Sequence, residues 1–181
     1  SFTAAALSTL NFGGGTFNLN PTSSVTGAGT IRFDGGTTTV GDTYNVSGNT
    51  TINGGTANFD SPSITAALNF SSGILTGSST VTVTGLTTWT GGTMSGSGST
   101  DANGGMNVSG SSTKFINQRT LNNAGTATVS GTAGIGGGNG STINNAGVFD
   151  VQGNLQVAAN SNGTNTFVNT GTLRKSAGAS L

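Results

Sequence analysis

The sequence predicts an all-β fold, a right-handed parallel β-helix (a solenoid) of about nine coils, each with roughly 20 residues and three short strands. A strand-like triplet recurs at a nearly constant period, small residues flank it on both sides, and no segment shows helical spacing. A right-handed winding is expected because crossovers between parallel strands are almost always right-handed. Since each coil contacts only its neighbours, residues 1–181 are predicted to form a single β-helix array.

The recurring triplet is the best-defined strand of each coil. The nine triplets are Leu10–Phe12, Ile31–Phe33, Thr50–Ile52, Leu68–Phe70, Thr87–Trp89, Met106–Val108, Ala127–Val129, Phe149–Val151 and Leu173–Lys175. Their third residues are 18 to 24 positions apart, and glycine usually stands four places before and two places after each one. Side chains alternate along a strand, so the polar middle residues face water and the third residues face inward. We therefore expect one buried stack along the rod, made of Phe33, Ile52, Phe70, Trp89, Val108, Val129 and Val151.

A second strand follows the downstream glycine of each coil. Its inward positions include Phe17 and Leu19 in the first coil and Thr113 and Phe115 in the sixth, where Lys114 would point outward. The outward positions of the first five coils are Thr16, Asn18, Thr37, Thr39, Thr56, Asn58, Ile74, Thr76, Thr93 and Ser95. This pattern resembles the flat Thr-x-Thr ladders of β-solenoid ice-binding proteins. Threonine is also favoured on any exposed strand, so both interpretations stay open.

A third strand completes the coil. Its expected inward residues are Val25, Tyr44, Val46, Ile64, Val81, Val83, Leu121, Ile143 and Phe167. Asn123, Asn145 and Asn169 each recur six places before the third residue of a triplet. We expect these three amides to stack as a hydrogen-bonded ladder at one corner, because coil turns need bonds from one coil to the next.

The end of the chain departs from this regularity. Gly134–Gly140 and Ala158–Gly163 are rich in small and polar residues and are expected to project as loops. Neither end shows a recognisable cap, since Leu10 and Phe12 begin the pattern almost at once. The chain is therefore expected to be a fragment or one unit of a longer fibre, stacked head to tail on flanking coils or identical subunits.

Composition restricts the chemistry. The chain has no His and no Cys, and its five basic side chains balance five acidic ones. We expect no enzymatic activity and no cofactor, no nucleic acid partner because the basic residues are few and scattered, and no membrane span in this segment. Asp42 and Asp60 stand nine and eight places after successive triplets, so their carboxylates could stack and hold a cation. In outline this resembles the stacked acids of β-helix pectate lyases, and a polysaccharide-binding or polysaccharide-processing β-helix is a second alternative.

A family resemblance rests on three Asn/Gly-rich segments, Thr50–Thr56, Leu121–Thr126 and Ile143–Val148. They resemble the repeats of bacterial autotransporter-associated β-strand passengers and of filamentous-haemagglutinin-type adhesins. The resemblance implies a rigid, non-enzymatic rod that displays binding loops on an extracellular or cell-surface bacterial fibre. Its partner would be a host surface, an environmental surface or a glycan. The resemblance supplies no catalytic residues.

Overall fold

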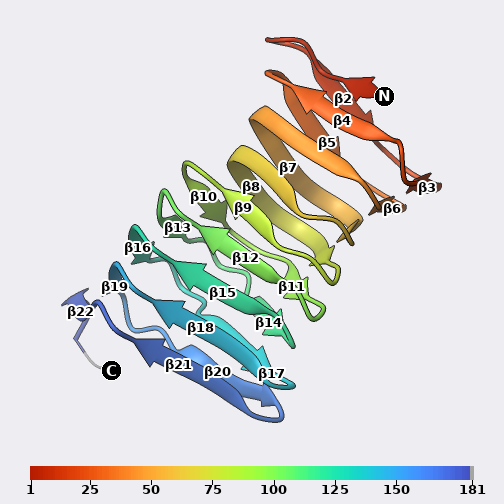
Figure 1. Ribbon diagram of the computed structural model, residues 1–181. Helices are drawn as coiled ribbons and strands as arrows, with labels where there is room; N and C mark the ends of the chain where they lie inside the picture. Colours follow the sequence, from red (N-terminus) through yellow and green to blue (C-terminus); the bar gives the residue numbers. More distant parts are fainter. Residues whose placement is uncertain (180–181) are drawn as a thin grey trace.

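The computed structural model describes residues 1–179, apart from the side chains of residues 158–162. Every regular element in this range is a β-strand, and the 22 strands form one continuous sheet that winds into stacked coils. Figure 1 shows the coils following one another from the N-terminus at one end to the C-terminus at the other. Neighbouring coils pair in parallel. The predicted class, an all-β parallel solenoid, is confirmed.

Each coil contributes one strand to each of three faces. Face 1 contains β1 (Phe2–Thr3), β4 (Ser24–Gly27), the first parts of β7 (Thr43–Phe59) and β8 (Ser63–Thr76), β9 (Val81–Val83), β12 (Ser99–Ala102), β15 (Thr120–Asn123), β18 (Ser141–Asn145) and β21 (Asn165–Asn169). Face 2 contains β2 (Thr9–Phe12), β5 (Thr30–Phe33), the middle of β7 and β8, β10 (Thr87–Trp89), β13 (Met106–Val108), β16 (Thr126–Val129), β19 (Val148–Gln152) and β22 (Thr172–Ala177). Face 3 contains β3 (Thr16–Leu19), β6 (Thr37–Val40), the ends of β7 and β8, β11 (Thr93–Ser95), β14 (Lys114–Asn117), β17 (Ile135–Gly138) and β20 (Val157–Asn162).

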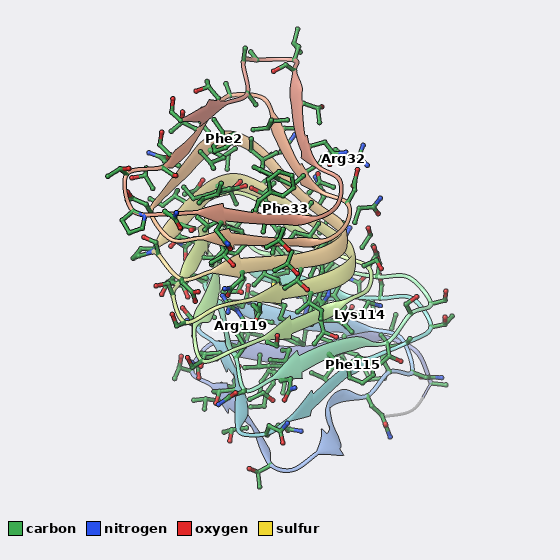
Figure 2. All side chains as sticks on the ribbon, turned by 90° about the vertical axis from the view of Figure 1, so that its right-hand side faces the viewer. Phe2, Arg32, Phe33, Lys114, Phe115 and Arg119 are labelled. Carbon is green, nitrogen blue, oxygen red and sulfur yellow. The ribbon has the colours of Figure 1, made fainter. Side chains whose placement is uncertain are left out.

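All nine predicted triplets lie on face 2 and are aligned residue by residue. The seven residues predicted for the interior stack are therefore in one column, and each is at most 8% exposed. Aromatic rings meet along this column: Phe12 stacks on Phe33 with centroids 5.4 Å apart, and Phe70 lies parallel to Trp89 at 6.3 Å. Figure 2 shows Phe33 in the interior of the solenoid and its polar neighbour Arg32 on the outside. Alternation along the strand thus sorts the side chains as expected.

Glycine at the corner before face 2 is required by close approach of the coils. A Cβ built on Gly48 would overlap the carbonyl oxygen of Gly29 in the preceding coil, and one on Gly147 would overlap that of Gly125. The same corner recurs in each repeat, so the recurring glycine is explained by backbone contact between coils.

The sixth coil corrects one prediction about face 3. Lys114 is fully buried and donates to the carbonyl oxygen of Ala133, Phe115 is 39% exposed, and Ile116 is buried. From Trp89 to the inward Met94 is five residues, whereas from Val108 to the inward Ile116 is eight. Three extra turn residues reverse the alternation, because an odd shift exchanges the two faces of a strand. The assignment of Thr113 and Phe115 inward and of Lys114 outward was wrong, since both Thr113 and Phe115 are exposed.

Ile64 is a second misassigned residue. It is 44% exposed on face 1, between the buried Ser63 and Thr65. The hydroxyl of Thr65 accepts from Thr50 at 2.9 Å, and Thr50 meets the hydroxyl of Tyr44 at 2.7 Å. This chain of buried hydroxyls has its hydrogen bonds satisfied, so polar residues can take inward positions that composition alone assigns to an apolar neighbour.

The two predicted loops are strands. β17 lies within Gly134–Gly140, and β20 covers most of Ala158–Gly163; they pair with each other and extend face 3. Backbone pairing needs only N–H and C=O groups, so glycine-rich segments can continue a ladder. The pairing between β17 and β20 is irregular, with shifts after Ile135 and after Gly137.

Candidate functional site

The threonine ladder of face 3 has the predicted register. Thr16, Thr37, Thr56, Ile74 and Thr93 form one outward column. Asn18, Thr39, Asn58 and Thr76 form the second, and Ser95 continues it in the next coil. All these side chains are exposed or half-buried. Ile74 interrupts the threonines, and Phe115 occupies the first column directly after Thr93.

Face 1 carries a comparable outward surface. Ser99, Thr120, Thr142 and Thr166 are aligned in one column. Beside it, Asn122 donates to Asp101 at 2.6 Å and Asn144 donates to Asn122 at 2.8 Å. Threonine is therefore not special to face 3. Its abundance on both faces is what exposed strands of a solenoid favour generally.

Asp42 and Asp60, the predicted cation ligands, point to different coils. Asp42 accepts a hydrogen bond from the backbone N–H of Thr22 in the preceding coil. Asp60 accepts from the N–H and hydroxyl of Ser78 in the following coil, both at 3.1 Å, and from Asn58 at 2.8 Å. The backbone N–H of Ser78 is the main cause of the lowered pKa of Asp60. Both carboxylates thus act as turn acceptors, and within residues 1–179 no three His, Cys, Asp or Glu side chains gather to hold a metal ion.

Asn123, Asn145 and Asn169 lie in one column at the corner between faces 1 and 2. Asn123 donates to the side-chain oxygen of Asn145, and Asn145 donates to that of Asn169, both at 2.7 Å. Each amide also donates to the carbonyl oxygen of the glycine two places on, at 2.9 to 3.2 Å. Each of the three asparagines therefore stabilises the turn of its own coil, and the bonds between their side chains join neighbouring coils.

Arg119 is a buried cation that the sequence analysis missed. Its guanidinium donates to the hydroxyl of Thr100 and to the carbonyl oxygens of Gly77, Ser79, Ser95 and Ser99. Burial lowers the pKa of Arg119 to about 10, and Asp101 opposes that shift. The signal was present in the spacing, because Arg119 stands two places before the inward Leu121 and alternation places both on the same side. Its five bonds tie three coils together at the corner between faces 3 and 1.

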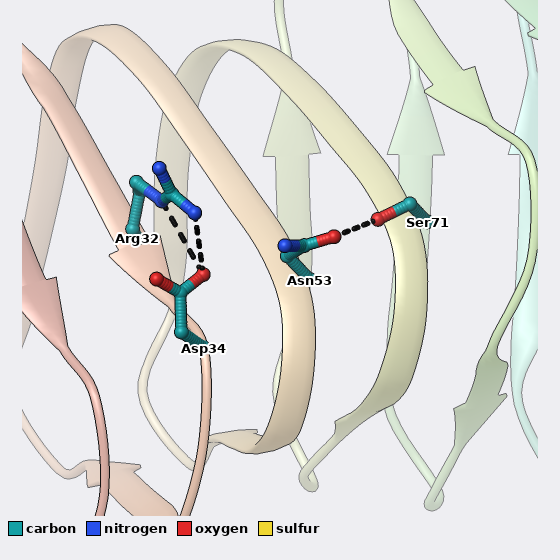
Figure 3. Close-up of polar contacts among 4 residues, drawn as sticks. All are labelled: Arg32, Asp34, Asn53 and Ser71. Carbon is teal, nitrogen blue, oxygen red and sulfur yellow. Dashed lines mark hydrogen bonds and ion pairs between the residues drawn. The ribbon is translucent and has the colours of Figure 1, made fainter.

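The outer surface of face 2 carries isolated polar contacts. Arg32 pairs with Asp34 at 2.9 Å, and Ser71 donates to Asn53 at 2.6 Å, as Figure 3 shows. Near the C-terminal end, Arg174 pairs with Asp150 at 2.9 Å. Hydrogen bonds from Arg174, Ser176 and Gln152 lower the pKa of Asp150 to about 2. These contacts link neighbouring residues or coils and do not converge on a common point.

Comparison of the chain with protein-family models, with curated proteins and with solved structures finds no match. No helix long and apolar enough to cross a bilayer occurs in the part of the chain that the structure describes.

Proposed function

We propose that this chain is a non-enzymatic rod segment of a bacterial surface or secreted fibre, which spaces and presents adhesive surfaces. The observation that carries the proposal is the unbroken bonding between coils, which pair on all three faces over one continuous interior. Arg119 and the asparagine ladder add side-chain links between coils at two corners. The proposed placement at a cell surface rests on the Asn/Gly-rich repeat pattern, and the surface contacted would be a host, environmental or glycan surface.

Such a rod would resist tension coil by coil. In a solenoid each repeat contacts only its neighbours, so load is carried by successive interfaces instead of one global core. Peeling one coil would release roughly 20 residues, or about 65 Å of extended chain. A protein with this task should therefore unfold in repeated steps.

Single-molecule force spectroscopy tests the proposal, with the chain held between two marker domains of known unfolding force. The expected record contains resisting events separated by about 65 Å or small multiples of it. A smooth extension without resistance, like that of a disordered linker, would contradict a load-bearing role.

Head-to-tail stacking, on flanking coils or on identical subunits, is the proposed mode of assembly. Among the described residues, β1, β2 and β3 each pair with one neighbouring coil, as do β20, β21 and β22 at the other end. Apolar side chains are accessible near both ends, Phe17 at 36% and Leu173 at 54%. Sedimentation velocity over a range of concentrations should show growing linear species, and a monomer at every concentration would count against this assembly.

The two alternatives make different predictions. An ice-binding solenoid would produce thermal hysteresis, and a Thr37→Lys substitution would abolish it. Ile74 and Phe115 interrupt the first threonine column, so face 3 does not carry a continuous flat threonine ladder. A polysaccharide-processing β-helix would release reducing ends from acidic polysaccharides. Asp42 and Asp60 already accept backbone hydrogen bonds, which favours the rod over a polysaccharide-processing site at these carboxylates.

A further inference from the structure

The threonine ladder of face 3 ends at a hollow beside an exposed aromatic ring. The hollow has a volume of about 220 Å³. It is lined by Thr93, Phe115, Ile116, Asn117, Gly137, Gly138 and Asn139. Phe115, which belongs to β14, is labelled in Figure 2. None of these seven residues, all in the described part of the chain, has a charged side chain.

The hollow exists because the coil that follows has no side chain at two outward positions, those of Gly136 and Gly138. Phe115, Ile116 and Asn117 of β14 pair in register with Gly136, Gly137 and Gly138 of β17. The glycines continue the backbone ladder but put no side chain beneath the ring. Phe115 thus has no side chain from its partner residue Gly136 beside it, whereas the threonines of earlier coils stand over one another.

Two amide side chains form the polar edge of the hollow. Asn139 donates to the side-chain oxygen of Asn117 at 2.7 Å, and both residues are exposed. That bond leaves the Asn117 amide as a donor and the Asn139 carbonyl oxygen as an acceptor toward solvent. Gln118 and Asn139 also have left-handed backbones, with φ of 64° and 51°. Non-glycine residues in this region are uncommon and gather at ligand-binding sites.

We propose that this hollow binds one ring of a neutral carbohydrate. The face of an aromatic ring is electron-rich and attracts the polarised C–H groups of a sugar ring, while an amide donor and acceptor match its hydroxyl groups. Pockets for drug-sized ligands measure about 300 to 1000 Å³, so this smaller volume suits a single ring. An uncharged lining suits an uncharged ligand, and the cations near it in sequence, Lys114 and Arg119, are both buried. The site goes beyond the rod function, because a rod without it would still carry load.

Isothermal titration calorimetry with cellohexaose, chitohexaose and mannohexaose tests the proposal, with a galacturonate hexamer as the charged comparison. At least one neutral hexamer should bind. Phe115→Ala should weaken that binding about tenfold, and Asn139→Gly about threefold. Ile74→Ala is the matched control, since Ile74 is 40% exposed in the same column but does not line the hollow, and binding should change by less than about twofold.

Absence of binding to all three neutral hexamers would overturn the proposal, as would binding of the galacturonate hexamer alone. Equal affinity in wild type and Phe115→Ala would also overturn it, and an equal loss in Ile74→Ala would assign binding to the whole face. Asn139→Gly keeps a residue that accepts a positive φ, so it tests the site even where Phe115→Ala fails to fold. The step pattern of wild type under force tests the rod separately.

Discussion

The interior of the first five coils is rich in aromatic rings and its buried polar groups are hydroxyls, whereas that of the last four contains buried amide and cationic side chains. Phe12, Phe33 and Phe59 contact one another or Tyr44, and Phe70 lies against Trp89. From the sixth coil onward the buried residues include Lys114, Arg119, Asn123 and Asn145. Backbone pairing nevertheless continues through both regions on all three faces, and on face 3 its register shifts between β17 and β20.

Main-chain pairing therefore maintains the coil in both regions, while different kinds of side chain fill and link the interior. Apolar side chains need only similar volume from coil to coil, because burial is non-directional. An amide ladder needs the same residue at the same place in each coil, because hydrogen bonds are directional. The polar half should therefore depend on fewer, more specific side chains.

The largest expected effect is in the aromatic half. Phe70→Ala should lower the free energy of unfolding by about 3 to 5 kcal/mol, because it opens a cavity against Trp89. The neighbouring outward residue is the control, and Asn69→Ala should cost less than about 0.5 kcal/mol. Denaturant midpoints measure both, and equal losses would remove the distinction between inward and outward positions.

Arg119 tests the polar half. Arg119→Met keeps much of the volume but leaves four carbonyl oxygens and a hydroxyl without their donor, so we expect a loss of about 3 kcal/mol. Arg32→Met is the control, since Arg32 is partly exposed and its pair with Asp34 contributes about 0 to 1 kcal/mol. Similar urea stabilities of the two variants would show that the buried guanidinium is not a link between coils.

The asparagine ladder should have a smaller effect. Asn145→Ala removes the middle amide, which accepts from Asn123 and donates to Asn169 and to two backbone carbonyls, and should cost about 2 kcal/mol. Asn144→Ala removes an outward amide and should cost about 0.5 kcal/mol or less. Thermal unfolding of the pair compares them, and a neutral Asn145→Ala would assign the corner to backbone bonds alone.

The smallest effect is the acid dependence of Asp150. Hydrogen bonds, first from Arg174, lower its pKa from 3.8 to about 2 in the folded protein. A lowered carboxyl pKa stabilises the fold above the unfolded pKa, and that contribution is lost as pH falls from about 4 through about 2. Asp150→Asn should be less stable than wild type at neutral pH and should nearly match it at pH about 2. Denaturant titrations at both pH values check this, and a difference that does not change with pH would contradict the ion-pair explanation.

Spacing alone was enough to place the triplets and the asparagines. Glycine is favoured where coils approach closely, as at Gly48, and it therefore marks the same corner in seven of the nine repeats. Between two such marks the strand alternation has a defined phase, which identified Phe70 as inward and Asn69 as outward. A residue at a constant distance from the mark must also stack on its equivalents, as Asn123, Asn145 and Asn169 do.

Only the tertiary structure decided what happens where the turns change length. No glycine at a constant position fixes the strand alternation after the three extra residues between Val108 and Ile116. Only the pairing of β14 with β11 and β17 shows that Phe115 is exposed and Lys114 is buried. The bonds of Arg119 likewise depend on carbonyl groups up to 42 residues away. By itself the sequence determined the coil, the three faces and the register, because these follow from local alternation and repeated close contacts. The hollow beside Phe115 and the buried cations depend on which coil lies above which, and this is a property of the assembled solenoid.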